Sequence, residues 1–100
     1  MLTLRNLYDQ REEFYDKTIE LDGWIKNIRA SKNVIFIELN DGTNFTPVQV
    51  VVGKEADNFD EIASQHLYAA LRVEGKFIET QGAQQPFEIQ AEKVEVLAES

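Results

Sequence analysis

The sequence predicts a mainly-β fold, a small five-stranded barrel with one helix between the third and fourth strands. Five segments alternate apolar and polar residues, as half-buried strands do, and one segment between them repeats its apolar residues at helical spacing. The chain of 100 residues is 43% apolar, which is enough for one small core. We therefore expect a single domain over residues 1–100, with an N-terminal helical extension at 1–16 and the barrel at 17–97.

A short helix is expected first, over residues 3–14. Thr3 is a residue type that favours the N-cap position of a helix. Leu4, Leu7 and Tyr8 then fall on one face, which gives this segment an apolar side.

The first strand is expected over residues 17–29. Gly23 lies in its middle, and a glycine inside a long strand indicates a bend or bulge of the kind that a small barrel needs to turn a corner. The alternation slips around Asn27, where the next residue is apolar. The apolar residues that define this strand are Ile19, Leu21, Ile25 and Ile28.

Two further strands are expected at 34–40 and 46–52, with a strong turn signal at Asn40-Asp41-Gly42. Alternation turns Phe36 and Gln49 away from the core. An exposed aromatic ring near an exposed amide is what a protein needs to stack one base and read its edge. The residues predicted to face inward are Ile35, Ile37, Leu39, Val48, Val50 and Val52.

The second half of the chain is expected to hold a helix at 58–66 and strands at 69–79 and 87–97, with a loop at 81–86. The helix would be capped by Asp57 or Asn58, and His66 would end it, where a histidine suits the helix dipole.

Three strands, a helix and two strands are the order of a Greek-key OB-fold barrel. This fold usually binds oligonucleotides or sugars on its second and third strands and in the loops 1–2 and 4–5. Phe36 and Gln49 are on those strands, Arg29 and Lys32 are at the first of those loops, and Glu88 follows the second.

The composition limits the kinds of function. A net charge of −8 argues against a protein that binds nucleic acid by phosphate neutralisation alone. Residues 26–33 nevertheless carry Lys26, Arg29 and Lys32 without an acid, which indicates either a basic rim for a phosphate backbone or an ordinary solvated turn. Cysteine is absent, and neither a signal peptide nor a transmembrane run is seen, so we expect a cytoplasmic protein that does not enter a membrane.

Several segments, in order and with domain-like spacing, resemble the N-terminal anticodon-binding domain of the asparaginyl-tRNA synthetases. The aspartyl and lysyl synthetases share this domain type and are an alternative. Asn27, Ile28 and Ala30 stand where the aspartyl pattern usually carries arginines and an acid, which favours the asparaginyl branch. The matching segments are Gly23-Trp24-Ile25-Lys26, Arg29, Ser31-Lys32, Phe36-Ile37, Leu39-Asn40-Asp41-Gly42 and Val48-Gln49-Val50-Val51.

The resemblance implies a role for each candidate site residue. Phe36 would stack the middle anticodon base, uracil, and Gln49 would read its edge with help from Arg29. Glu88 would pair with the guanine at the first anticodon position. Lys26 and Lys32 stay open between phosphate contact and plain solvation.

The resemblance also implies what this chain lacks. It shows no nucleotide-binding glycine loop and no Cys/His cluster, and it has no room for a synthetase catalytic domain. We therefore expect no aminoacylation and no cofactor in this domain; ATP and magnesium belong to a separate catalytic domain. The expected partners are the anticodon loop of the asparagine tRNA and that catalytic domain, in an enzyme that is a homodimer.

Two other classes of function remain open from the sequence. One is a general binder of single-stranded nucleic acid, which would want several exposed aromatic residues along a basic surface. The other is a protein-interaction domain in which Phe36 docks a partner.

Overall fold

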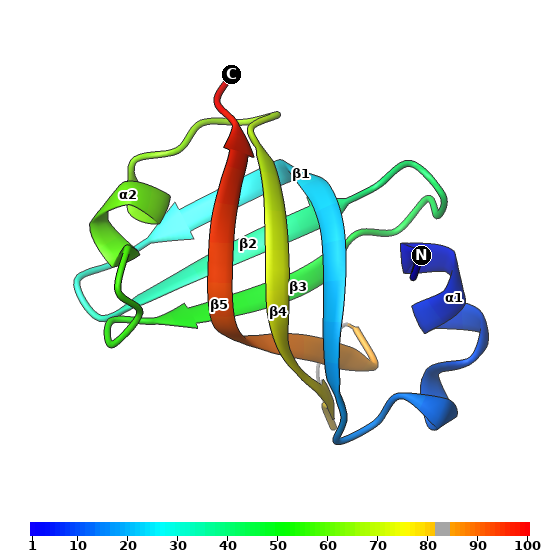
Figure 1. Cartoon of the computed structure of the whole chain (residues 1–100). Coiled ribbons are helices and arrows are strands. Elements are labelled where there is room, and N and C mark those ends of the chain that lie inside the picture. The colour runs from blue at the N-terminus through cyan, green and yellow to red at the C-terminus, as the bar shows by residue number, and fades with distance from the viewer. Residues whose placement is uncertain (82–84) are drawn as a thin grey trace.

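The computed structural model describes residues 1–81 and 85–100 and shows a closed five-stranded barrel. The strands follow the order β1-β2-β3-β5-β4 around the barrel (Figure 1), and of these neighbours β3 and β5 alone are parallel within the described residues. This confirms the predicted fold class. The elements are α1 (Leu4–Asp9), η1 (Arg11–Glu13), β1 (Thr18–Ala30), β2 (Val34–Asn40), β3 (Val48–Gly53), α2 (Phe59–Ala63), β4 (Ala70–Glu79) and β5 (Phe87–Ala98).

The barrel interior is filled by the residues that alternation turned inward. Ile35, Ile37 and Leu39 of β2 are fully buried, as are the inward valines Val48 and Val50 of β3. Burial of each such side chain contributes roughly 1.5–3 kcal/mol, so the alternating pattern holds the strands in register.

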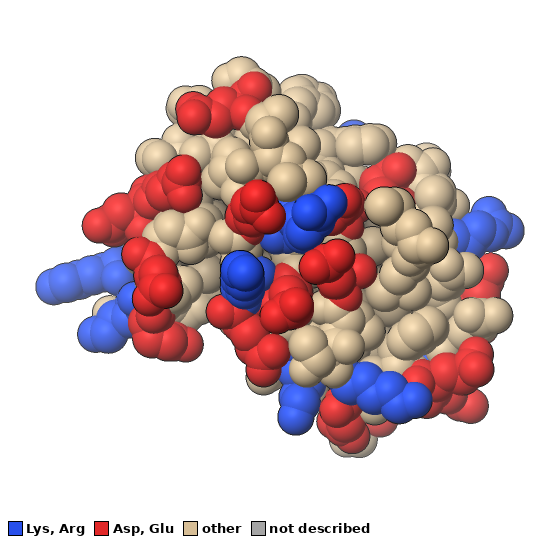
Figure 2. All heavy atoms as spheres, viewed as in Figure 1, with Lys and Arg blue, Asp and Glu red and all other residues tan. Residues whose placement is uncertain are grey.

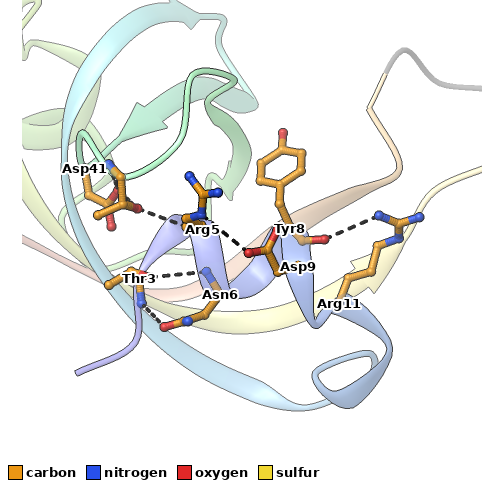
Figure 3. Close-up of polar contacts among 8 residues, drawn as sticks. Thr3, Arg5, Asn6, Tyr8, Asp9, Arg11 and Asp41 are labelled. Atoms are coloured by element: carbon orange, nitrogen blue, oxygen red, sulfur yellow. Dashed lines mark hydrogen bonds and ion pairs between the residues drawn. The ribbon is translucent and has the colours of Figure 1, made fainter.

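The N-terminal segment forms two short helices, and the prediction of one helix over 3–14 was wrong in that respect. Thr3 is the N-cap of α1: its hydroxyl accepts from the Asn6 backbone, and the Asn6 side chain accepts from the Thr3 backbone (Figure 3). Leu4 and Leu7 are fully buried in the barrel core. The helix stops at Gln10 because no apolar residue follows within the next turn to pack against the barrel.

Strand β1 bends as its central glycine predicted. It pairs with β4 up to Trp24 and with β2 from Trp24 onwards. A β-carbon on Gly23 would lie 2.7 Å from the Asn40 carbonyl oxygen, so this close approach of two strands needs glycine. The predicted slip is confirmed, because the register shifts between Ile25 and Asn27.

The α2 helix is shorter than the predicted 58–66 and ends at Ala63, so the expectation that His66 ends it was wrong. After the helix the chain turns towards β1 before β4 begins, because the Tyr68 backbone N–H donates to the Ile25 carbonyl at 2.8 Å. Asn58 occupies the N-cap position without capping the helix; its side chain donates to the Val94 carbonyl instead.

Other strand limits differ slightly from the prediction. β3 begins at Val48 because Pro47 has no N–H for the ladder. Alternation along β2 turns Asn40 to the same outward side as Phe36, yet Asn40 is buried, and its side chain accepts from the Gly42 backbone N–H at 2.8 Å. The predicted loop at 81–86 falls partly on 82–84, which lie outside the described residues.

The surface carries mixed charge. Figure 2 shows acidic and basic side chains interleaved over the face that carries β1, β4 and β5. In the described part of the chain, no helix is long and apolar enough to cross a membrane.

Candidate nucleic-acid interface

The outward side chains of four neighbouring strands form a continuous row across the barrel. Asn27 of β1 pairs with Glu38 of β2, Glu38 with Gln49 of β3, and Gln49 with Glu88 of β5. Directly paired residues lie on neighbouring strands whose backbones are about 4.7–4.9 Å apart. Gln49 and Glu88, which are 39 positions apart in the sequence, are therefore immediate neighbours.

This row borders a pocket of about 300 Å³, which we call the central pocket. Arg29, Gln49 and Glu88 all line it, so the structure brings together three of the residues singled out in the sequence. The complete lining is Arg29, Glu38, Gln49, Thr80, Gln85, Phe87 and Glu88.

Phe36 lies beside the central pocket, in the next row of outward residues. It is only partly buried, and it is the register partner of Arg29 on one side and of Val51 on the other. The Arg29 guanidinium carbon is 5.4 Å from the centroid of the Phe36 ring, a cation–π contact. This contact links the aromatic ring to the pocket, because Arg29 belongs to both.

Gln49 is positioned through its backbone. Its N–H donates to the Gln85 side-chain oxygen at 3.2 Å, at the point where the parallel pairing of β3 with β5 begins. The Gln85 carbonyl in turn accepts from the Thr80 hydroxyl at 2.6 Å, which ties the end of β4 to the residues before β5. The Gln49 side chain borders the central pocket and brings one amide donor and one amide acceptor to it.

Two carboxylates and one guanidinium set the charge of the central pocket. Glu38 accepts a hydrogen bond from the Asn27 amide at 3.0 Å, and Glu88 accepts a long one from Gln90 at 3.4 Å. The excess of acid repels phosphate and favours groups that donate hydrogen bonds. The pocket is therefore suited to the edge of a base rather than to a sugar–phosphate backbone.

The two candidate lysines lie elsewhere. Lys26 stands at the bulge of β1 and lines a different pocket together with Trp24. Lys32, in the turn between β1 and β2, borders a pocket whose other residues include the acids Asp57 and Asp60. The structure does not bring either lysine to the central pocket.

Sequence reasoning missed Glu38, Thr80 and Gln85 as pocket residues. Alternation along β2 puts Glu38 on the same outward face as Phe36, so the sequence contained the signal that would have identified Glu38. Thr80 and Gln85 follow no periodicity, since they lie where β4 ends and just before β5 begins.

An outward aromatic ring beside a polar pocket on β2, β3 and β5 is the kind of surface with which this fold binds single-stranded nucleic acid. The pattern of the OB-fold nucleic acid binding domain, a tRNA anticodon family, matches residues 19–97. The chain belongs to this family and is an anticodon-binding OB-fold domain, which confirms the resemblance noted in the sequence.

The relatives of this chain include asparagine–tRNA ligases. The asparagine–tRNA ligase of Bacillus cytotoxicus is 50% identical over 93 residues, which are 93% of this chain and 20% of the ligase. The asparaginyl-tRNA synthetase of Pyrococcus horikoshii superposes with a TM-score of 0.78 at 26% identity, over 88% of this chain and 21% of that one. A putative aspartyl-tRNA synthetase of Leishmania major superposes with a TM-score of 0.85 at 20% identity, over 99% of this chain and 21% of that one, a likeness of fold alone.

The chain therefore spans about a fifth of the length of the relatives that it matches.

Proposed function

We propose that this domain binds the anticodon loop of the asparagine tRNA and reads its first two bases. The observation that carries the proposal is the direct pairing of Gln49 with Glu88 across β3 and β5, in one pocket next to Phe36. The 50% identity to an asparagine–tRNA ligase supports the choice of tRNA.

The middle uracil fits the Gln49 amide. Uracil presents an N–H donor flanked by two carbonyl acceptors, and an amide answers an adjacent donor and acceptor together. Cytosine reverses the donor and the acceptor at two adjacent positions of this edge. An amide held in the orientation that reads uracil then leaves a buried group unpaired, which costs roughly 1–3 kcal/mol. Held in that orientation, Gln49 supplies the choice between the two pyrimidines.

The first base, guanine, fits the Glu88 carboxylate. Guanine carries two adjacent N–H donors on its edge, and a carboxylate offers two acceptor oxygens at a matching spacing. An acid in an RNA-binding pocket repels phosphate, so Glu88 acts on a base edge.

Phe36 and Arg29 supply affinity to the same site. A base that stacks on the Phe36 ring gains roughly 1–3 kcal/mol whichever base it is. The Arg29 guanidinium lies over the ring at 5.4 Å. When a base takes that place, Arg29 remains near enough to the bound RNA to donate to a base carbonyl or a phosphate.

In this proposal the domain works as part of a longer asparagine–tRNA ligase, since its relatives are about five times its length. The remainder of that enzyme, a homodimer, activates asparagine with ATP and magnesium. The domain itself selects the tRNA and needs no cofactor. The cytoplasm, where tRNA is charged, is the proposed location.

The test is a binding series with two RNA hairpins, one with the asparagine anticodon and one with its middle uracil changed to cytosine. The wild-type domain should prefer uracil, and Gln49→Ala should lose most of that preference while it keeps much of the affinity. Gln10→Ala, which removes an exposed amide from the N-terminal segment, is the matched control.

An unchanged uracil-to-cytosine ratio in Gln49→Ala would show that Gln49 is not the reader. Equal binding of both hairpins by the wild type would identify a general single-strand binder instead.

A further inference from the structure

A second pocket, separate from the one that holds Gln49 and Glu88, lies where β1 meets the loop between β2 and β3. We call it the Trp24 pocket; it encloses about 630 Å³. Its aromatic walls are Trp24 and Phe45, and its cations are Arg5 and Lys26. The anticodon-reading site described above uses none of these four residues.

The Trp24 ring is held in place before any ligand arrives. A β-carbon on Gly42 would lie 3.1 Å from Cη2 of the indole, so the ring packs directly on the turn at that glycine. The turn needs glycine for a second reason, because its φ is +84°. Even so, 36% of Trp24 stays exposed, more than a purely structural packing role explains.

Phe45 is the least covered aromatic residue among those described, with 99% of its surface exposed. The loop that carries it is shaped by local bonds: the Asp41 carboxylate accepts from the Thr43 backbone at 3.0 Å, and the Asn44 amide donates to the Thr46 carbonyl at 3.0 Å. A partly exposed ring and a fully exposed ring in one pocket are suited to stacking, since every base offers a π-face.

The charge of the Trp24 pocket suits a nucleic-acid strand. Arg5 is paired with Asp9 at 3.5 Å (Figure 3), but both side chains are more than 60% exposed, so the pair is weak and Arg5 can turn to a phosphate. Lys26 has no ion-pair partner within the described residues. Two cations face one acid, Glu38, whereas the central pocket has two acids and one cation.

The two pockets adjoin, because Glu38 lines both of them. This adjacency and the reversal of charge favour the same RNA strand as the occupant.

We propose that the Trp24 pocket is a further nucleotide subsite, in which Trp24 and Phe45 stack a loop base other than the two that Gln49 and Glu88 read, while Arg5 and Lys26 hold its phosphate. This inference rests on the proposed function, because it takes its RNA from the anticodon loop.

Trp24 is the only tryptophan in the chain, so its fluorescence reports on this pocket alone. The experiment titrates the domain with the asparagine-anticodon hairpin and follows tryptophan fluorescence and, separately, the anisotropy of a labelled RNA. Hairpins with an abasic site at each loop position in turn then locate the stacked nucleotide. We expect quenching by the intact hairpin, and loss of quenching for one abasic position that is neither the first nor the middle anticodon base.

Phe45→Ala should weaken the intact hairpin about five-fold or more, and should have little further effect on the hairpin that is abasic at that position. Tyr68→Ala is the matched control: it removes another exposed aromatic ring, 64% exposed, from the loop before β4. It should leave binding unchanged. Thermal unfolding checks that each variant is folded.

Binding without tryptophan quenching, or with wild-type affinity in Phe45→Ala, overturns the subsite and leaves the reading by Gln49 intact. If Phe45→Ala weakens binding while Gln49→Ala keeps the uracil preference, the subsite stands and the proposed reader fails. A wild-type domain that gives no response to the hairpin at low salt overturns both. Concentration-dependent dimerisation that Phe45→Ala abolishes would assign the rings to a second copy of the chain instead.

Discussion

At the scale of single residues, the contact between Arg29 and Phe36 sets the state of the domain before RNA arrives. The guanidinium lies over the ring at 5.4 Å, so one face of the aromatic side chain is occupied by its own strand neighbour. A cation–π contact at an exposed site is worth only about 0.5–1 kcal/mol, less than the roughly 1–3 kcal/mol of base stacking. In the proposed function, a base therefore displaces the guanidinium from the ring.

Phe36→Ala tests this directly. The variant should bind every hairpin more weakly, by about 1–3 kcal/mol, since stacking does not depend on which base is stacked. Anisotropy titration with the uracil and cytosine hairpins measures both affinities, and Phe36→Tyr, which keeps a ring, should bind close to wild type. A loss confined to one hairpin would argue that Phe36 acts in discrimination.

Asp22 and Arg72 predict a pH dependence of stability. Arg72 donates to the two Asp22 carboxylate oxygens at 2.8 and 3.0 Å, and these bonds lower the pKa of Asp22 below its ordinary value. A carboxyl whose pKa is lower in the folded state stabilises the fold above its unfolded pKa of about 3.9, and this stabilisation is lost as the pH falls through the folded pKa.

Wild type should therefore melt above Asp22→Asn at neutral pH, and the difference should close as the pH falls below the unfolded pKa of Asp22 and through its lower folded pKa. Thermal unfolding of both proteins over this range measures it. A difference that persists unchanged in acid would assign the effect to packing rather than charge.

At the scale of elements, the bend of β1 is what brings the two candidate pockets onto one wall of the barrel. The strand leaves β4 and joins β2 at Trp24, next to the close contact of Gly23 with the Asn40 carbonyl. The bulge that follows turns Arg29 towards the Phe36 side of the sheet and Lys26 towards Trp24.

Gly23→Ala should destabilise the domain by about 1–3 kcal/mol, because its β-carbon would meet backbone and a core side chain, Leu39, at 2.7 and 3.0 Å. Urea unfolding measures the change. Gly53→Ala is the control, since the group that its β-carbon would meet is the flexible end of Glu55, and it should stay near wild type. Equal effects of the two substitutions would contradict the assigned role of the bend.

At the scale of the whole molecule, a net charge of −8 leaves few sites where RNA phosphates are attracted. The cations near the two pockets are Arg29, Lys26 and Arg5, while Lys32 is turned towards acids. In the proposed function, recognition therefore depends on stacking and base edges more than on phosphate neutralisation.

The salt dependence of binding should accordingly be shallow. Two or three phosphate contacts to a single strand give a slope of log K against log salt of about −1.4 to −2. Hairpin titrations over a series of salt concentrations measure it. A slope steeper than about −4 would indicate many more phosphate contacts and favour a general electrostatic binder.

The sequence by itself determined which face most strand residues take, because a strand has a side-chain period of two and the core must be apolar. Asn40, which alternation turns outward and the structure buries, is an exception. Alternation alone placed Phe36 and Gln49 outward, and the break in the alternation at Asn27 indicated the bulge. Only the tertiary structure decided what these residues meet. The parallel pairing of β3 with β5 sets Glu88 beside Gln49, the turn carrying Lys32 points to an acidic pocket, and the β2–β3 loop leaves Phe45 uncovered near Trp24. These contacts form when the barrel closes and brings together segments that are far apart in the chain. A local sequence pattern carries no information about them.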